Sequence, residues 1–344
     1  MRDLKYLLAY LVPASALLGL AWHGIWSWMT VALVFGLLPV LELYTPKSIL
    51  NVPKENEEHR ARRAFFDWLL YLNAPLLFGI VGWYLWLVAA QTLGIAEIIG
   101  LTLAVGIVAG TCGINVAHEL GHRTNRKEQV LAQIMLLPSL YQHFFVEHNR
   151  GHHKNVATDE DPASARLGEN VFRFWLRSVT GGWRSAWALE RERLAKSALP
   201  TTYWDNTMLR YSFCQTIWLV AILFFLGWQA LLGAIAVAII GFLLLETVNY
   251  IEHYGLRRKI LATGRPEPVS PCHSWNSNHE LGRIFLYELT RHSDHHFKST
   301  RKYQILRHLD ESPQMPFGYP TSIILALMPI LWFRLMDKKV AQHP

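Results

Sequence analysis

The chain has 344 residues, of which 51% are hydrophobic and 17% are charged, and its mean hydropathy is +0.15. Soluble domains carry about a quarter charged residues, so this composition excludes an ordinary soluble protein. The net charge of +7 does not indicate nucleic-acid binding, because the basic residues follow the pattern of a membrane topology and no nucleic-acid motif occurs.

Six apolar runs are each close to the ~20 residues that a helix needs to cross a bilayer. In chain order, the predicted spans are Leu4–Leu20, Ile25–Tyr44, Trp68–Ala90, Ile95–Ala117, Ser212–Leu226 and Leu231–Tyr250. The first run resembles a cleaved signal peptide, but the charge pattern is consistent only if it is retained. The expected fold is therefore all-α, a single integral-membrane domain over residues 1–344 with six transmembrane helices.

Lysine and arginine are distributed unevenly among the connections. The short turns at 21–24, 91–94 and 227–230 contain neither residue, whereas the second and fourth connections and both ends of the chain are basic. The positive-inside rule then predicts that both termini and both long connections are cytoplasmic. Residues 118–210 and 253–320 are expected to form a cytoplasmic helical cap.

Two further apolar stretches are ambiguous. Val130–Val146 is interrupted by Pro138 and His143, and Thr321–Met336 is short and contains Pro329. Such lengths are more typical of interfacial or re-entrant helices than of spans. Counting either one as a span would also divide the histidine segments between the two sides of the membrane.

Histidine is the unusual residue of this chain. Sixteen histidines occur, and nine of them fall in four short segments. They are His118, His122, His148, His152, His153, His253, His292, His295 and His296. Because neutral imidazole is a common metal ligand, these residues are the candidate metal ligands.

The spacing within the segments has a helical explanation. Residues four apart on a helix differ by about 40° in direction, whereas adjacent residues differ by about 100°. The neighbouring pairs His152–His153 and His295–His296 can therefore present imidazoles to two neighbouring ions from one helix. Nine donors also exceed what one ion can bind, so the pattern predicts a binuclear site.

Two alternatives use the same residues differently. His118-Glu119-x-x-His122 is a literal H-E-x-x-H, the zinc-protease signature with Glu119 as general base, but such a site leaves most of the other histidines without a role. A metal transporter places polar groups near the bilayer midplane, whereas the charged residues Glu42 and Glu97 lie near the ends of their spans.

The four segments resemble a known family. HELGHR at 118–123, EHNRGHH at 147–153, NYIEHYGL at 249–256 and LTRHSDHHF at 289–297 are similar to the signatures of bacterial alkane 1-monooxygenases, which belong with the fatty acid desaturases to the histidine-box membrane di-iron enzymes. The likeness extends over roughly residues 40–320. The sequence departs from the common form of these signatures at Arg123, Thr290 and Phe297, and none of these positions is a predicted metal ligand.

The resemblance implies a rubredoxin-dependent oxidoreductase of the bacterial inner membrane. It implies terminal hydroxylation of medium-chain n-alkanes to 1-alkanols with O2, at two Fe ions held by the nine histidines. The n-alkane would enter from the membrane lipid. Xylene monooxygenase has similar segments, so hydroxylation of methyl-aromatics or fatty acyl chains is the related alternative.

The electrons are expected from a separate donor, because the sequence has no C-x-x-C pair, flavin fingerprint or haem motif. The resemblance implies reduced rubredoxin, served by a reductase and fused to the enzyme in some members. Basic residues of the cap either attract this acidic partner or face anionic lipid. These basic residues of the cap are Arg166, Arg173, Arg177, Arg184, Lys298, Arg301, Lys302 and Arg307.

Two further sets of residues are assigned around the site. Glu119, Glu147, Glu252 and Asp294 are interpreted either as groups that orient imidazole N–H bonds or as ordinary surface residues. Gly106, Gly110 and Gly113 leave little side-chain volume in the fourth span, which favours either a narrow substrate channel or close helix packing.

Overall fold

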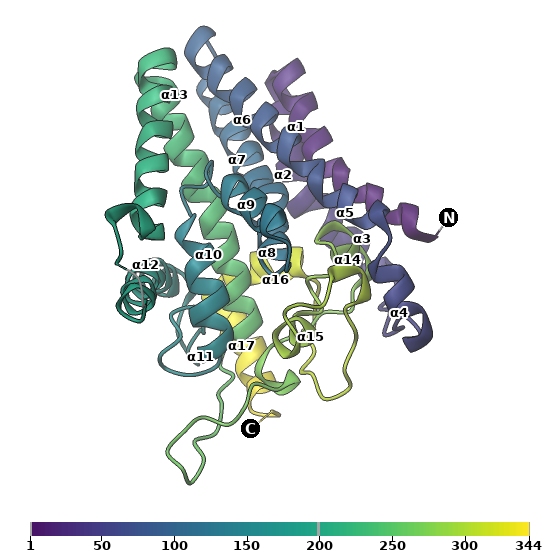
Figure 1. The fold of residues 1–344 in the computed structure, drawn as a ribbon. Helices are drawn as coiled ribbons and strands as arrows, with labels where there is room; N and C mark the ends of the chain where they lie inside the picture. The colour runs from purple at the N-terminus through teal and green to yellow at the C-terminus, as the bar shows by residue number, and fades with distance from the viewer. Residues whose placement is uncertain (1, 198–199, 344) are drawn as a thin grey trace.

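The computed structural model describes residues 2–197 and 200–343. Across these residues the chain is helical, and three isolated β-bridges stand in place of any strand. Long helices form a bundle, and shorter helices and loops gather at its lower end in Figure 1. The predicted all-α class is confirmed.

Five continuous helical stretches are long and apolar enough to cross a membrane: Asp3–Trp22, Gly24–Tyr44, Ala64–Ala90, Ile95–Gly121 and Thr207–His253. The first four match the first four predicted spans. They are built from η1 (Arg2–Tyr10) and α1 (Leu11–Trp22); η2 (Gly24–Trp28), α2 (Met29–Val31), η3 (Ala32–Leu37) and α3 (Leu38–Tyr44); α5 (Ala64–Tyr71) and α6 (Asn73–Ala90); and α7 (Ile95–Val108), η4 (Ala109–Asn115) and α8 (Val116–Gly121).

The fifth stretch, α13 (Thr207–His253), has 47 residues. At ~1.5 Å per residue, a straight helix of this length would be more than twice as long as the ~30 Å hydrocarbon core. The chain instead reverses direction at Gly227, whose φ of 84° lies in a region that glycine adopts readily. The two legs, visible in Figure 1, correspond to the fifth and sixth predicted spans.

The remaining helices are short or amphipathic. They are α4 (Lys54–Ala61), α9 (Arg126–Met135), α10 (His143–Glu147), η5 (His148–His152), α11 (His153–Asn155), α12 (Val171–Ala195), α14 (Glu280–Phe285), α15 (His292–Phe297), α16 (Tyr319–Ala326) and α17 (Pro329–Val340). Single 3₁₀ turns lie at Tyr203–Asp205, Pro271–His273 and Tyr303–Ile305. The helices α16 and α17 meet at 119°, a bend that fits either a broken span or a re-entrant segment, so the expected re-entrant or interfacial segment stays a prediction.

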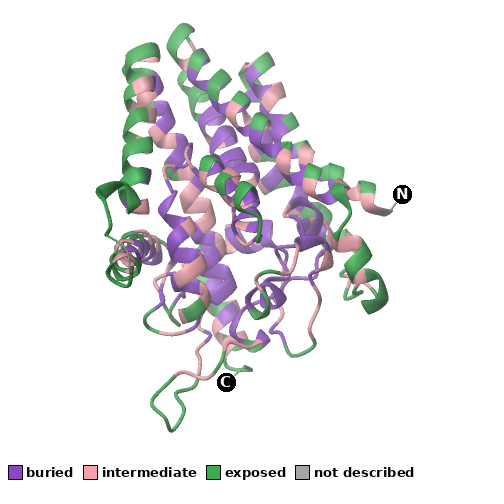
Figure 2. Cartoon of the chain, in the orientation of Figure 1, coloured by how far each residue is buried: buried purple, intermediate pink, exposed green. Residues whose placement is uncertain are grey.

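The outer surface of the bundle is apolar. Phe224, Phe225 and Trp228 are 80%, 77% and 62% exposed at the tip of α13, and Figure 2 shows exposed residues along the outside of the upper bundle. Many exposed large apolar residues of this kind are unfavourable in water and mark an interaction with lipid or protein. Together with the apolar spans, they identify a membrane protein.

The glycines of the fourth span bring helices close together. A Cβ atom on Gly106 would overlap the side chain of Ile240, and one on Gly110 would lie 2.9 Å from Leu244, both on the second leg of α13. A Cβ atom on Gly113 would lie 3.3 Å from Leu77 of α6. Small residues that let helix backbones approach are a common means of packing in membranes.

We predict that Gly106→Val destabilises the bundle, because the added side chain has no space beside Ile240. Overpacking of this kind lowers the free energy of unfolding by about 1–3 kcal/mol, which thermal unfolding in detergent measures. Gly79→Val is the matched control, because no heavy atom lies within 4 Å of a Cβ atom there. Equal stability of the two variants would contradict the close packing.

Candidate metal centre

All nine candidate histidines converge on one place, where they form two groups. Within each group, one possible ligand atom from every residue lies within 4.8 Å of the others. The first group is His118, His122, His148, His153 and His295, and the second is His152, His253, His292 and His296. The sequence-predicted site residues are therefore brought together in a five-histidine group and a four-histidine group.

Local helix geometry explains this division. His152 and His153 are adjacent at the junction of η5 and α11 and belong to different groups. His295 and His296 are adjacent on α15 and are likewise divided. The η5 turn is π-helical, and single π-helical turns are frequent at functional sites. The expected divergence of neighbouring imidazoles is thus present in the fold.

The distances between ring nitrogens fit a shared cation. The Nε2 atom of His148 is 3.0 Å from Nε2 of His122 and 3.1 Å from Nε2 of His153. In the second group, the distance from His152 Nε2 to His296 Nε2 is 3.2 Å. Metal–nitrogen bonds of about 2.0–2.1 Å place neighbouring ligand atoms roughly this far apart, so the spacing suits coordination.

Burial also favours ligation. It lowers the pKa of His292, His295 and His296 well below the usual value, so these imidazoles are neutral and have a free lone pair. Among the described residues, both ring nitrogens of His295 and Nε2 of His118 are buried with no hydrogen-bond partner. Buried polar atoms are normally satisfied, and a bound cation would satisfy these.

Asp161 orients one of the imidazoles, and the sequence analysis missed it. Its Oδ2 atom is 2.9 Å from Nδ1 of His152 and also accepts a hydrogen bond from Ser164 Oγ at 2.6 Å. Burial acts to raise the pKa of Asp161, but His152 and the hydrogen bonds outweigh it and lower the pKa. Nδ1 of His152 is therefore held by a carboxylate, which leaves Nε2 for the cation.

The four acidic residues assigned from the sequence have different partners. Glu252 Oε2 is 3.2 Å from Nε2 of His292, and its Oε1 accepts a hydrogen bond from Tyr319 at 2.6 Å. Glu252 therefore lies beside the four-histidine group.

The other three acidic residues form contacts with polar groups around the site. Glu119 accepts hydrogen bonds from Arg123 at 3.0 Å and from the Tyr303 backbone at 3.1 Å. Glu147 lies 3.3 Å from Ser185 Oγ. Asp294 pairs with Arg307 at 2.8 Å and with Arg301 at 3.1 Å.

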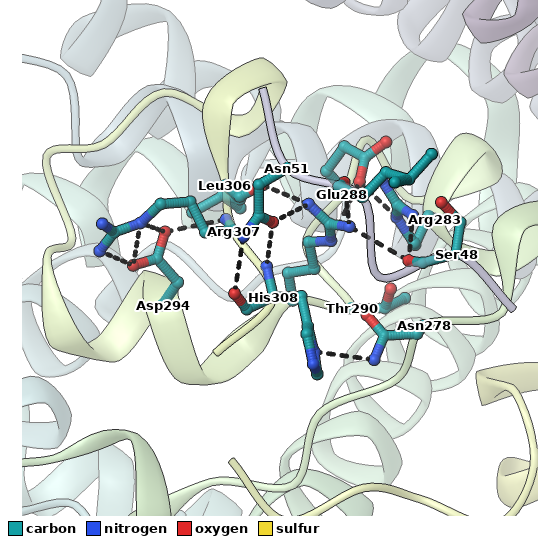
Figure 3. A network of polar contacts seen from close by, with 12 residues as sticks. Ser48, Asn51, Asn278, Arg283, Glu288, Thr290, Asp294, Leu306, Arg307 and His308 are labelled. Atoms are coloured by element: carbon teal, nitrogen blue, oxygen red, sulfur yellow. Dashed lines mark hydrogen bonds and ion pairs between the residues drawn. The ribbon is translucent and has the colours of Figure 1, made fainter. Parts of the chain in front are cut away.

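A buried polar network fixes the start of α15 (Figure 3). Arg291 donates to the carbonyl groups of Leu306 at 2.7 Å and Leu50 at 2.9 Å. Arg283 donates to the Ser48 carbonyl at 2.7 Å and to Glu288 at 2.6 Å. These bonds tie Arg291, the residue before α15, and Arg283 of α14 to the extended chain that follows α3.

An apolar cavity leads to the histidines. Its empty volume is about 1030 Å³, including the open space at its mouth, and it contacts His118, His148 and His292. Most of the lining is aliphatic or aromatic, including Val34 and Leu245. Of the three glycines considered for a channel, Gly110 lines this cavity, whereas Gly106 and Gly113 pack against neighbouring helices.

Comparison with known proteins gives the family. Residues 95–324 match the fatty acid desaturase family. Alkane 1-monooxygenase 2 of Pseudomonas aeruginosa is 39% identical over 330 residues, covering 95% of this chain and 87% of the relative. Alkane 1-monooxygenase of Pseudomonas putida is 37% identical over 342 residues, covering 97% and 84%. The hydroxylase component of a xylene/toluene monooxygenase of Pseudomonas putida is 28% identical over 343 residues, covering 98% and 89%.

The helical bundle and the histidine groups are those of a membrane-bound histidine-box enzyme, and the chain belongs to the fatty acid desaturase family. Within that family it is a member of the alkane 1-monooxygenases. The resemblance drawn from the four histidine segments is confirmed, and the protein is an oxidoreductase of this type.

We predict that Asp161→Asn weakens metal binding, because the amide cannot replace the carboxylate that holds His152. Loss of such an orienting group lowers metal affinity by about 10–100-fold. Metal retained after dialysis against a chelator measures the effect. Asp159→Asn is the control, since Asp159 is 83% exposed and pairs with Arg257. If both variants retain metal equally, Asp161 has no orienting role.

Proposed function

We propose that this enzyme hydroxylates the terminal methyl group of medium-chain n-alkanes to give 1-alkanols, using O2 at a di-iron centre. The observation that carries the proposal is an apolar cavity that contacts two adjoining histidine groups. The relatives named alkane 1-monooxygenase support the same chemistry. Methyl-aromatics or fatty acyl chains are the alternative substrates, favoured by the xylene/toluene relative.

The nine histidines would hold the two irons, five around one ion and four around the other. Imidazole ligands suit iron, although they also suit zinc, copper and nickel, so the assignment of iron rests on the family. Reduced iron held by these histidines would supply the activation of O2. The protein positions the histidine ligands, binds the hydrocarbon and excludes water from the site.

The cavity lining favours a hydrocarbon substrate. Transfer of an alkane from water to an apolar environment gains ~0.8 kcal/mol per CH2 group, so the substrate is concentrated in the bilayer and enters from it. The cavity is bounded by residues of α3, η4 and α13, such as Leu38, Gly110 and Leu245. An alkane that extends between these helices would present its terminal methyl group at the histidines.

The contacts of Glu119 argue against the metalloprotease alternative. A zinc protease needs this glutamate as a general base beside the metal-bound water. Here the carboxylate is engaged by Arg123 and by the backbone N–H of Tyr303. In addition, seven further histidines surround the H-E-x-x-H pair, which a single three-ligand zinc site does not require.

The distribution of basic residues supports an orientation with both termini and the histidine centre on the cytoplasmic side of the bacterial inner membrane. Reduced rubredoxin would then supply electrons from the cytoplasm. Several basic residues are engaged in ion pairs, Arg307 with Asp294 and Lys302 with Asp67. Lys298, directly after α15, is exposed and is a candidate contact for the acidic donor.

Product analysis tests the proposed reaction. The purified enzyme, supplied with iron, O2, reduced rubredoxin and n-alkanes from hexane to hexadecane, is expected to form primary alcohols. His253→Ala is expected to abolish turnover because it removes one member of the four-histidine group. Predominantly secondary alcohols, or faster oxidation of toluene than of any n-alkane, would contradict the substrate assignment.

We predict that reduction by rubredoxin slows as ionic strength rises, because salt screens attraction between exposed charges. Stopped-flow kinetics at increasing salt measure this response. Lys298→Glu should slow reduction further at low salt, whereas Lys196→Glu, which also reverses an exposed lysine, should not. A rate independent of salt would exclude electrostatic steering.

A further inference from the structure

Glu42 is a buried carboxyl group that the assignments above leave without a role. It lies near the end of α3 and is 4% exposed. Its side chain lines the apolar cavity that contacts the histidines. Among the described residues, neither carboxyl oxygen has a hydrogen-bond partner of good geometry, although the backbone of Gly282 lies beside it.

Two glycines leave space for this carboxyl group. A Cβ atom on Gly282 would lie 2.9 Å from Oε1 of Glu42, and one on Gly318 would overlap both oxygens. Gly282 belongs to α14 and Gly318 precedes α16, so two separate segments approach the same side chain. The carboxyl group of Glu42 therefore lies against the backbone of both segments.

The position is unfavourable unless something binds there. Burying a polar group without a partner in an apolar environment is unfavourable, and ionisable residues within membrane segments mark functional sites by default. Glu252, the other carboxyl group that lines the cavity, is satisfied by Tyr319 at 2.6 Å. Glu42 is therefore the carboxyl group of the cavity lining that has no side-chain partner among the described residues.

The chemistry of the cavity indicates the ligand. An n-alkane carries no hydrogen-bonding group, so it cannot satisfy Glu42. Hydroxylation creates a hydroxyl group on the same chain in the same cavity, and a hydroxyl can both donate and accept a hydrogen bond. We propose that Glu42 binds the hydroxyl group of the 1-alkanol product. This inference rests on the proposed function.

Binding at Glu42 distinguishes product from substrate. A hydrogen bond between Glu42 and the hydroxyl group stabilises the bound alcohol, so the alcohol binds more tightly than the alkane of equal length. The enzyme is then inhibited by its own product, and Glu42 sets the strength of that inhibition.

The test compares inhibition by 1-decanol during hydroxylation of n-decane, with wild type and variants in bilayers of one composition so that lipid partitioning is equal. In Glu42→Leu, the inhibition constant of 1-decanol should rise on the order of tenfold, the equivalent of 1.4 kcal/mol, while the KM for n-decane is unchanged or lower. Glu42→Gln, which keeps hydrogen-bonding capacity, should retain most of the inhibition. Gly318→Ala should weaken inhibition because it displaces the carboxyl group.

Glu128→Leu is the matched control. Glu128 is 9% exposed and accepts a hydrogen bond from Tyr71 at 2.7 Å, and it lies outside the cavity lining, so inhibition by 1-decanol should stay at the wild-type value. Equal inhibition constants for wild type and Glu42→Leu would overturn the proposal.

A binding measurement separates this inference from the proposed function. In wild type, 1-decanol should raise the unfolding temperature more than n-decane does, and this difference should vanish in Glu42→Leu whether or not the enzyme turns over. Failure to hydroxylate n-decane would refute the proposed function. Successful hydroxylation with no difference between 1-decanol and n-decane would refute only the role of Glu42.

Discussion

The structure depends on the convergence of nine imidazoles in its interior. Each of the two groups directs ring nitrogens toward one another at about 3 Å, and several of these atoms have no partner among the described residues. Such an arrangement is unfavourable by itself, because buried polar atoms need partners. Cations at the two centres would satisfy the nitrogens and join four segments that lie far apart in the sequence, and metal binding would then be coupled to folding.

The rest of the fold positions these four segments. The close approach of the fourth span to α13 at Gly106 and Gly110 brings the helices that carry His118 and His253 together. The network around Arg291 then fixes α15 against the segment after α3. The same helices line the apolar cavity, so the packing that brings the histidine groups together also builds the proposed hydrocarbon site.

Much of this could be predicted from the sequence. Hydropathy located the spans, including the two legs of α13, because the cost of placing polar groups in hydrocarbon is large and local in the chain. The spacing of the histidines predicted that His295 and His296 would diverge, since helical geometry fixes their directions. The similarity to the alkane 1-monooxygenases was recognised from the four sequence segments that contain these histidines.

Other features depend on contacts between distant segments and leave no periodic signal. Asp161 lies in a loop nine residues after His152, where nothing in the local sequence distinguishes it from Asp159. The sequence also left the roles of Gly106 and Gly110 open, because a small residue permits both packing and a channel. Glu42 was noted only as a charge near the end of a span, since its lack of partners is visible only once Gly282 and Gly318 are in place.

The most direct test of the account is the number of iron ions bound per chain by the purified protein, determined by elemental analysis together with protein quantification. The account predicts two iron ions in the wild type. It also predicts a deficit in His253→Ala that spares the five-histidine group, so that about one ion per chain remains. A single zinc ion in the wild type, or full metal content in His253→Ala, would contradict a centre built from both groups.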